Sequence, residues 1–336
     1  MKENKISHLN FGPFFIAFAA FLWTLDAIAR GQLSQVVNPS VLVFYEHLII
    51  ILVISPYLIR YFRGLKDLDL KEWFALCFIA IGGSSLATIA ITAAYSYQNG
   101  AFIAIVALLQ QTQPIIAIGF AHLWLKEKLP SYYYTLTFFA IFGVFLMFFP
   151  FLTNFTNDIK QLFSVFFNLS NDAIIAGILG LIAAFFWGSS TVFGRYLLTH
   201  GKTKFSYDQM TTYRFFIAFI FLLVFNLIQR NSFVVRTIWE SPINFGRLLF
   251  IALVPGLLSL ILYYYGLKTT HASVSAIMEL AYPLSALVIL PLVFKNQFVE
   301  SIQIIGAIIL IISSGLLSYL YGKMSYSDII IIVENV

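Results

Sequence analysis

The stretch Glu279-Leu280-Ala281-Tyr282-Pro283 interrupts an otherwise apolar run from about 272 to 294. Proline has no N–H, so Pro283 inside a helix leaves the carbonyl of Glu279, four residues earlier, without its usual partner. The break and the one carboxylate of this run therefore fall at the same place. In hydrocarbon, such a break is tolerated only where the freed groups are buried in protein or line a watery cavity.

A related stretch, Gln110-Gln111-Thr112-Gln113-Pro114, lies in an apolar run in the first half of the chain. Pro114 frees the carbonyl of Gln110 as Pro283 frees that of Glu279. The same number of residues separates Gln110 from Glu279 and Pro114 from Pro283. The two helix breaks are therefore predicted to line one substrate site near the middle of the bilayer.

The composition excludes a water-soluble protein. Of 336 residues, 60% are hydrophobic and only 10% are charged, whereas a soluble domain carries roughly 25% charged residues. Apolar runs of about 20 residues are long enough to span a bilayer. The predicted membrane-spanning runs lie near 11–29, 40–59, 73–94, 99–124, 132–150, 173–199, 207–228, 246–266, 272–294 and 299–321.

The two halves of the chain resemble each other beyond the helix breaks. Ala20-Phe21-Leu22-Trp23-Thr24 is similar to Ala184-Phe185-Phe186-Trp187-Gly188, and Phe44-Tyr45-Glu46 corresponds to Thr212-Tyr213-Arg214. This pattern predicts two diverged units of five helices. Five is odd, so the second unit enters the membrane from the opposite side, as in an inverted repeat. We predict an all-α integral membrane protein with ten transmembrane helices around a central cavity.

The chain is predicted to consist of four parts. The first repeat covers 1–150, an interfacial linker on the outer side covers 151–172, the second repeat covers 173–322, and a cytoplasmic tail covers 323–336. The side that holds both termini collects about twice as many Lys and Arg residues as the other, which favours cytoplasmic termini. We therefore expect a multi-pass protein of the plasma (bacterial inner) membrane with both termini in the cytoplasm.

These features together resemble the EamA type of the drug/metabolite transporter superfamily. The resemblance rests on Trp187-Gly188-Ser189-Ser190, on Glu127-Lys128-Leu129 after the fourth run, and on the paired Pro114 and Pro283. It extends from about 11 to 321. Lys295-Asn296-Gln297 lacks the glutamate that closes the fourth run of the first repeat. The resemblance implies ten helices in two inverted repeats, with the first four helices of each repeat around a cavity for a small metabolite.

Ionisable groups inside the spans are the strongest site candidates, because a mid-bilayer charge costs at least ~2.5–3.5 kcal/mol without a partner or a cavity. Glu279 is a candidate proton carrier and substrate contact, or else a carboxyl that only holds helices together. Gln110 and Gln113 share one face of a helix and are predicted to face the same cavity. Their alternative is interhelical hydrogen bonding.

Glu46 and Arg214 occupy matching positions in the two repeats with opposite charge. Either they contact a substrate ammonium and a substrate carboxylate, or they form structural ion pairs, Glu46 with Arg214 or Arg214 with Glu279. Asp26 and Arg30 stand four residues apart in the order that favours a helical ion pair. We favour an Arg30 that extends to the outer interface and draws Asp26 with it, with a gate as the alternative.

Five deeper aromatic residues are candidates for stacking on a substrate, with ordinary packing as the alternative: Trp23, Trp187, Tyr45, Tyr213 and Tyr282. The single cysteine, Cys77, and five scattered histidines show no metal-ligand spacing. We therefore expect no catalytic residues, metal or cofactor, and no nucleic-acid partner.

The sequence predicts a secondary transporter that works by alternating access, with a small-molecule substrate, the lipid bilayer and protons as partners. Because both signs of charge are available, an amino acid or a similar zwitterionic or cationic metabolite is the first substrate hypothesis. The alternatives are a transporter of another class of solute, such as nucleotide-type metabolites, and a membrane-embedded enzyme or lipid-handling protein. The chain is expected to be a monomer or a homodimer.

Overall fold

The computed structural model describes residues 10–97, 103–153, 171–293 and 299–323, and these residues form helices joined by short connections. The predicted linker falls mainly on 154–170 and the predicted tail on 324–336, which lie outside the described residues. Lys295-Asn296-Gln297 also lies outside them.

The first half of the chain begins with α1 (Gly12–Leu33) and α2 (Pro39–Tyr61), which continues as η1 (Phe62–Asp67). One continuous span follows, made of α3 (Leu70–Cys77), η2 (Phe78–Leu86) and α4 (Ala87–Ser96). The last elements of this half are α5 (Ile103–Gln110), α6 (Gln113–Trp124) and α7 (Ser131–Thr153).

The second half follows the same order. It begins with α9 (Asn171–Arg195), which continues as η4 (Tyr196–His200), and α10 (Tyr207–Ile228), followed by the short α11 (Arg236–Trp239). One continuous span comes next, made of α12 (Pro242–Ile251), η5 (Ala252–Leu258) and α13 (Ser259–Leu267). The last elements are α14 (Ala272–Met278), α15 (Ala281–Val293) and α16 (Ser301–Lys323). Both η2 and η5 are π-helical, and each lies in the third span of its half.

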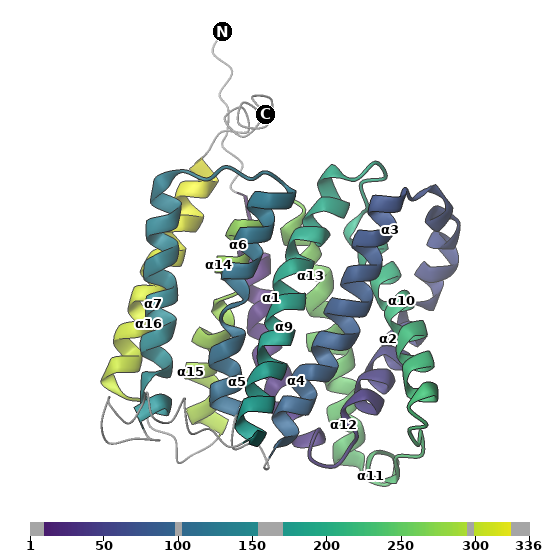
Figure 1. The fold of residues 1–336 in the computed structure, drawn as a ribbon. Coiled ribbons are helices and arrows are strands. Elements are labelled where there is room, and N and C mark those ends of the chain that lie inside the picture. The colour runs from purple at the N-terminus through teal and green to yellow at the C-terminus, as the bar shows by residue number, and fades with distance from the viewer. Residues whose placement is uncertain (1–9, 98–102, 154–170, 294–298, 324–336) are drawn as a thin grey trace.

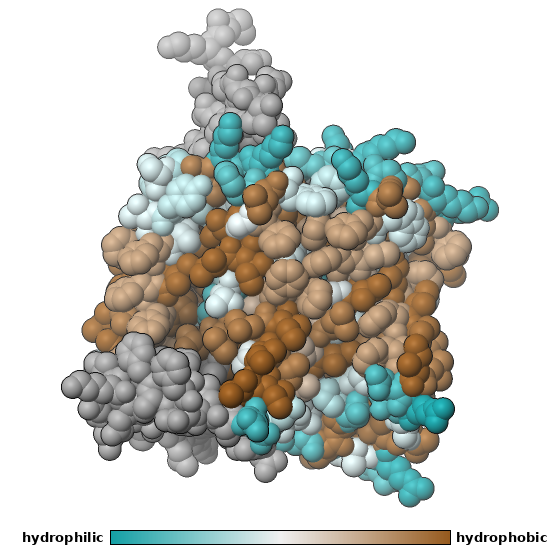
Figure 2. Space-filling view, viewed as in Figure 1, coloured by the Kyte–Doolittle hydropathy of each residue, from teal (hydrophilic) through white to brown (hydrophobic). Residues whose placement is uncertain are grey.

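Nine helices in the described part of the chain are long and apolar enough to cross a bilayer. The remaining predicted span, near 99–124, is present as the two shorter helices α5 and α6, separated at Gln111 and Thr112. The apolar side chains form a band across the middle of the molecule, with polar side chains at its upper and lower edges (Figure 2). This is the surface expected of a protein surrounded by lipid.

The two halves run in opposite directions. Figure 1 shows that α7 ends and α9 begins at one edge of the molecule, whereas α14 begins and α16 ends at the opposite edge. The start of α1 lies at that second edge, where Asn10 Nδ2 donates to the carbonyl of Thr269 over 2.8 Å. The first helix of each half therefore starts from a different side of the membrane.

Helices of one half pack mainly on helices of the other. α1 lies against α13, α2 against α10, and α9 against α4, α5 and α6. The last helices, α7 and α16, pair along one flank (Figure 1). A Cβ on Gly143 would stand 2.6 Å from the carbonyl oxygen of Gly306, so the backbones of this pair touch only because both residues are glycine.

A buried carboxylate joins the two halves at the edge where α14 begins. Glu127, in the connection between α6 and α7, accepts from Ala272 N at 2.9 Å and from Ser273 N at 3.1 Å. It also accepts from the hydroxyl of Ser273 at 2.6 Å. The Tyr133 hydroxyl donates to the Ser273 carbonyl at 2.6 Å. The first turn of α14 thus receives its missing hydrogen-bond partners from the other half.

Replacing Glu127 by Gln should destabilise the fold, because an amide presents N–H groups where the carboxylate accepts three hydrogen bonds. We expect a loss of about 1–3 kcal/mol, measured as a lower melting temperature of the purified protein in detergent. The matched control is E240Q, since Glu240 is exposed. Equal melting temperatures for E127Q and E240Q would contradict this role for Glu127.

Candidate functional site

The two predicted helix breaks face each other inside the molecule. α5 ends at Gln110 and α6 begins at Gln113, and α14 ends at Met278 where α15 begins at Ala281. Across this gap, the Gln113 side-chain amide donates a hydrogen bond to Glu279 Oε2. Helix breaks that lie far apart in the sequence thus meet at one polar spot.

The break around Glu279 is tighter than the proline rule alone predicts. The carbonyl of Glu279 is not left without a partner, because the N–H of Tyr282 donates to it over 3.0 Å. The N–H of Leu280 likewise donates to the carbonyl of Ile277 over 3.1 Å. Both are bonds between residues three apart, which tighten the end of α14 in the manner of a 3₁₀ turn.

The Glu279 carboxylate is buried, with 7% of the residue exposed, and it is held by hydrogen-bond donors. Its Oε1 accepts from the Tyr263 hydroxyl at 2.8 Å, from Ser275 Oγ at 3.2 Å and from Thr191 Oγ1 at 3.3 Å. Arg214 does not pair with it, which excludes one of the two ion pairs considered for Arg214. The four donors come from α6, α9, α13 and α14, so Glu279 connects both halves of the chain.

The ion pair between Asp26 and Arg30 forms as predicted, but Arg30 does not extend to the interface. The Arg30 Nε lies 2.6 Å from Asp26 Oδ2, and its Nη2 lies 2.8 Å from Glu46 Oε2. Only 3% of Arg30 is exposed. Glu46, on α2, is the partner that the sequence did not reveal. It gives Arg30 a second carboxylate partner inside the protein, which offsets the desolvation cost of burying the guanidinium.

The other alternative for Glu46, an ion pair with Arg214, is wrong because Glu46 pairs with Arg30 instead. Arg214 is held by hydroxyl groups, with Nε 2.5 Å from Ser84 Oγ and Nη1 2.6 Å from the Tyr264 oxygen. Arg30 pairs with two carboxylates, whereas Arg214 forms no ion pair with another residue that the structure describes.

Each of the two repeat-related tryptophans binds the opposite half. Trp23 Nε1, on α1, donates to Ser259 Oγ just after η5 over 2.8 Å, and Trp187 Nε1, on α9, donates to the carbonyl of Gly83 in η2 over 2.9 Å. Trp187 thus contacts the π-helical η2, and Trp23 contacts the residue that directly follows the π-helical η5. Such segments leave carbonyl groups out of the regular pattern and often mark functional sites.

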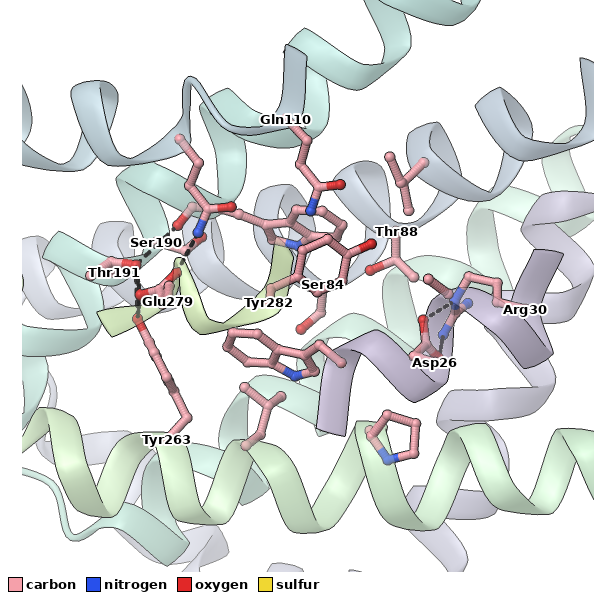
Figure 3. A pocket seen from close by; sticks show the side chains of 18 of the residues that line it. Asp26, Arg30, Ser84, Thr88, Gln110, Ser190, Thr191, Tyr263, Glu279 and Tyr282 are labelled. Carbon is pink, nitrogen blue, oxygen red and sulfur yellow. Dashed lines mark hydrogen bonds and ion pairs between the residues drawn. The ribbon is translucent and has the colours of Figure 1, made fainter. Parts of the chain in front are cut away.

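These elements surround one central cavity, with about 1160 Å³ of space not filled by atoms, including space that is open to solvent. Figure 3 shows Glu279, Thr191, Ser190 and Tyr263 at one end of it and Asp26 with Arg30 at the other. Of the residues predicted to bind substrate, eight line the cavity: Glu279, Gln110, Gln113, Glu46, Arg214, Tyr282, Trp23 and Trp187. Pro114, Asp26 and Arg30 line it as well.

Tyr45 and Tyr213 do not line this cavity, which corrects their assignment to the substrate site. Pro283 does not line it either, but the helix break predicted there is present, since α14 ends at Met278 and α15 begins at Ala281. The hydroxyl of Tyr45 donates to the carbonyl of Phe233 at 2.5 Å, and that of Tyr213 donates to the carbonyl of Tyr61 at 2.6 Å. Each tyrosine directly precedes a cavity residue, Glu46 or Arg214, and consecutive helical side chains point about 100° apart.

Several hydroxyl groups in the wall were not predicted from the sequence, including those of Thr191, Tyr263, Ser84 and Ser190. Thr191 could have been found, because it stands one helical turn after Trp187 on the same face. No feature of the sequence distinguished Tyr263 as a site residue, since 18% of the residues in the chain are aromatic. Across the described residues, no cluster of His, Cys, Asp and Glu is suited to hold a metal.

Comparison with known proteins agrees with this architecture. The profile of the EamA-like transporter family matches residues 10–149 and 174–319. The chain is 31% identical over 306 residues to the riboflavin transporter ImpX of Fusobacterium nucleatum subsp. nucleatum, covering 90% of this chain and 95% of that protein. A protein of known crystal structure, 12% identical, superposes with a TM-score of 0.64 over 92% of this chain and 96% of its own.

The two profile matches correspond to the two halves that meet around the cavity, and together they cover most of the chain. With its helices, its central cavity and these matches, the chain belongs to the EamA-like transporter family of the drug/metabolite transporter superfamily, and it is a secondary transporter.

Proposed function

We propose that the chain transports a flavin, a planar heteroaromatic solute with a hydroxylated side chain, of which riboflavin is the reference compound. The observation that carries this proposal is the lining of the cavity. It combines aromatic side chains, such as Trp23, Trp187 and Tyr282, with neutral hydrogen-bonding groups such as Gln110 and Ser190. An uncharged solute with a flat ring and several hydroxyl groups suits such a wall. A related protein is a riboflavin transporter, which supports the same choice.

The state of the buried charges speaks against the first substrate hypothesis, an amino acid. That hypothesis required Glu46 and Arg214 to be free for a substrate ammonium and carboxylate. Instead Glu46 is paired with Arg30, as is Asp26, so Glu46 is not free for a substrate ammonium. Binding a zwitterion would add two more charges to a site whose own charges are largely engaged, at a cost in desolvation.

Nucleotide-type solutes fit less well for a related reason. A phosphate group is usually bound by several cationic side chains or backbone N–H groups. The cavity wall contains two arginines, and one of them, Arg30, already serves two carboxylates. The alternative of a membrane-embedded enzyme is removed by membership of a transporter family.

Transport would proceed by alternating access, with the two inverted halves rocking against each other around the cavity. We place the protein in the bacterial inner membrane with both termini in the cytoplasm, on the distribution of Lys and Arg. The repeat division at 1–150 and 173–322 is part of the same proposal, as is a monomer or homodimer as the working unit.

The purified protein in liposomes should therefore catalyse counterflow of labelled riboflavin. Flavin fluorescence should also be quenched on binding, because the ring would stack on aromatic side chains. We expect labelled leucine and the phosphorylated flavin FMN to give at least about tenfold weaker competition, a difference of ~1.4 kcal/mol. Counterflow of amino acids without any flavin signal would remove the flavin proposal and leave a transporter.

We propose that Asp26 and Arg30 also form part of a gate, because their pair borders the cavity and joins α1 to α2 through Glu46. D26N leaves Arg30 paired with Glu46, so its melting temperature should fall less than that of R30Q, while transport should be about tenfold slower, as for a barrier raised by ~1.4 kcal/mol. R30Q leaves the buried Glu46 and the partly buried Asp26 without a cation and should destabilise the fold by about 3–5 kcal/mol.

The comparison of D26N with R30Q separates the two roles of this cluster. Thermal unfolding reports the structural role, and riboflavin counterflow reports the gate. If D26N folds and transports like the wild type, the Asp26–Arg30 pair is a structural ion pair only.

Proton coupling at Glu279 is the last part of the proposal. The carboxyl group is buried at the junction of both halves, and its neighbours are hydroxyl and amide donors rather than cations. A side chain in this position can exchange a proton as the halves move. Wild-type uptake of riboflavin should therefore respond to an imposed pH gradient, whereas E279Q, which cannot titrate, should transport without responding to it. Wild-type uptake that ignores the gradient would indicate facilitated exchange instead.

A further inference from the structure

We propose that Arg214 and Ser190 form a donor corner that binds the carbonyl edge of the solute ring and so fixes the orientation of the substrate in the cavity. The inference rests on the proposed flavin transport and assigns one edge of the ring to two named side chains.

The guanidinium of Arg214 is held in place from two sides. Its Nε donates to Ser84 Oγ on η2, and its Nη1 donates to the hydroxyl of Tyr264 on α13. It also lies over the Tyr264 ring, with Cζ 5.8 Å from the ring centroid. These interactions use two of the three guanidinium nitrogens and orient the plane of the group. The third nitrogen, Nη2, takes part in neither of these hydrogen bonds.

Nη2 lies beside a hydroxyl group that has no partner among the described residues. Ser190 Oγ is buried and unpaired there. A Cβ placed on Gly83 would stand 2.3 Å from Ser190 Oγ and 3.5 Å from Arg214 Nη2. The two groups are therefore neighbours on the same side of η2, and the glycine provides the room that lets both approach it. Arg214 and Ser190 both line the cavity.

Such a corner would bind a ligand that carries hydrogen-bond acceptor atoms. Guanidinium nitrogens can only donate, and a buried hydroxyl without a partner costs free energy until it is paired. The pyrimidine edge of a flavin ring carries two carbonyl oxygens and the nitrogen N1, which accept hydrogen bonds, and N3–H between the carbonyls, which donates one. One oxygen could accept from Nη2 and Ser190 together. The two methyl groups at the far edge of the same ring could accept nothing.

An unpaired acceptor elsewhere in the wall complements this corner. His47 Nδ1 lies 2.9 Å from the carbonyl of Val43, so Nδ1 donates and Nε2 is left as an acceptor. His47 Nε2 is buried and has no partner among the described residues, and His47 lines the cavity. It can accept from a hydroxyl of the flavin side chain. In this arrangement the carbonyl oxygens of the ring bind Arg214 and Ser190, and the hydroxyl groups of the side chain bind His47.

The test uses the full-length protein in nanodiscs, with quenching of flavin fluorescence as a binding readout. Riboflavin is compared with 3-methylriboflavin, which blocks the carbonyl edge, and with an analogue altered only at the methyl edge. The variants are R214Q, R214K and S190A. The control is R236Q, because Arg236 is exposed and outside the cavity.

We expect the wild type and R236Q to bind riboflavin and to reject 3-methylriboflavin while accepting the analogue altered at the methyl edge. S190A should keep the wild-type melting temperature, because the Ser190 hydroxyl has no partner among the described residues, and should bind riboflavin about 3- to 10-fold more weakly. R214Q should bind about tenfold or more weakly and lose the discrimination between riboflavin and 3-methylriboflavin. R214K, which keeps the charge without the planar fork, should lose that discrimination as well.

Other outcomes separate the proposals. Absence of riboflavin binding by the wild type would overturn the proposed function itself. Normal riboflavin binding with unchanged discrimination in S190A and R214K would overturn the donor corner alone. A wild-type preference for FMN that disappears in R214Q would show that Arg214 binds a phosphate group, which also overturns this inference. S190A keeps the test decisive if R214Q fails to fold.

Discussion

The structure depends on one constraint: a backbone that leaves its helical pattern inside a membrane must find hydrogen-bond partners within the protein. The chain meets this constraint by bringing its two broken spans together. Gln113 at the start of α6 donates to Glu279 at the end of α14, and the tight turn at Glu279 satisfies its own carbonyl. Tyr263 and Thr191 complete the shell around the carboxylate. The cavity exists because two irregular segments can be stable only beside each other.

The sequence predicted the fold well because lipid restricts the choices. Apolar runs of spanning length become helices, and an odd number of spans per repeat inverts the second copy. The broken fourth span was predicted from Pro114, and the cavity residues near both breaks were predicted from Gln110 and Glu279. These features depend on residues close together in the chain or on the number of spans, so a single sequence is sufficient to predict them.

The pairing of charges could not be predicted in the same way. Arg30 takes Glu46 as a second partner because its guanidinium reaches a side chain of α2, a contact that the sequence of neither helix reveals alone. Tyr45 and Tyr213 were assigned to the site because they adjoin charged residues, yet helical geometry turns them toward the backbone carbonyls of Phe233 and Tyr61. Such errors arise because contacts between residues that are far apart in the chain decide where a side chain points, and the sequence alone does not show these contacts.

The exchanged tryptophan contacts have an implication for the origin of the protein. Trp23 binds next to η5 and Trp187 binds η2, so each half supplies an indole that the other half needs. A single half on its own would lack this donor at its π-helical segment. Two antiparallel copies of one ancestral half would supply it to each other reciprocally, and fusion of their genes would have made that mutual dependence permanent.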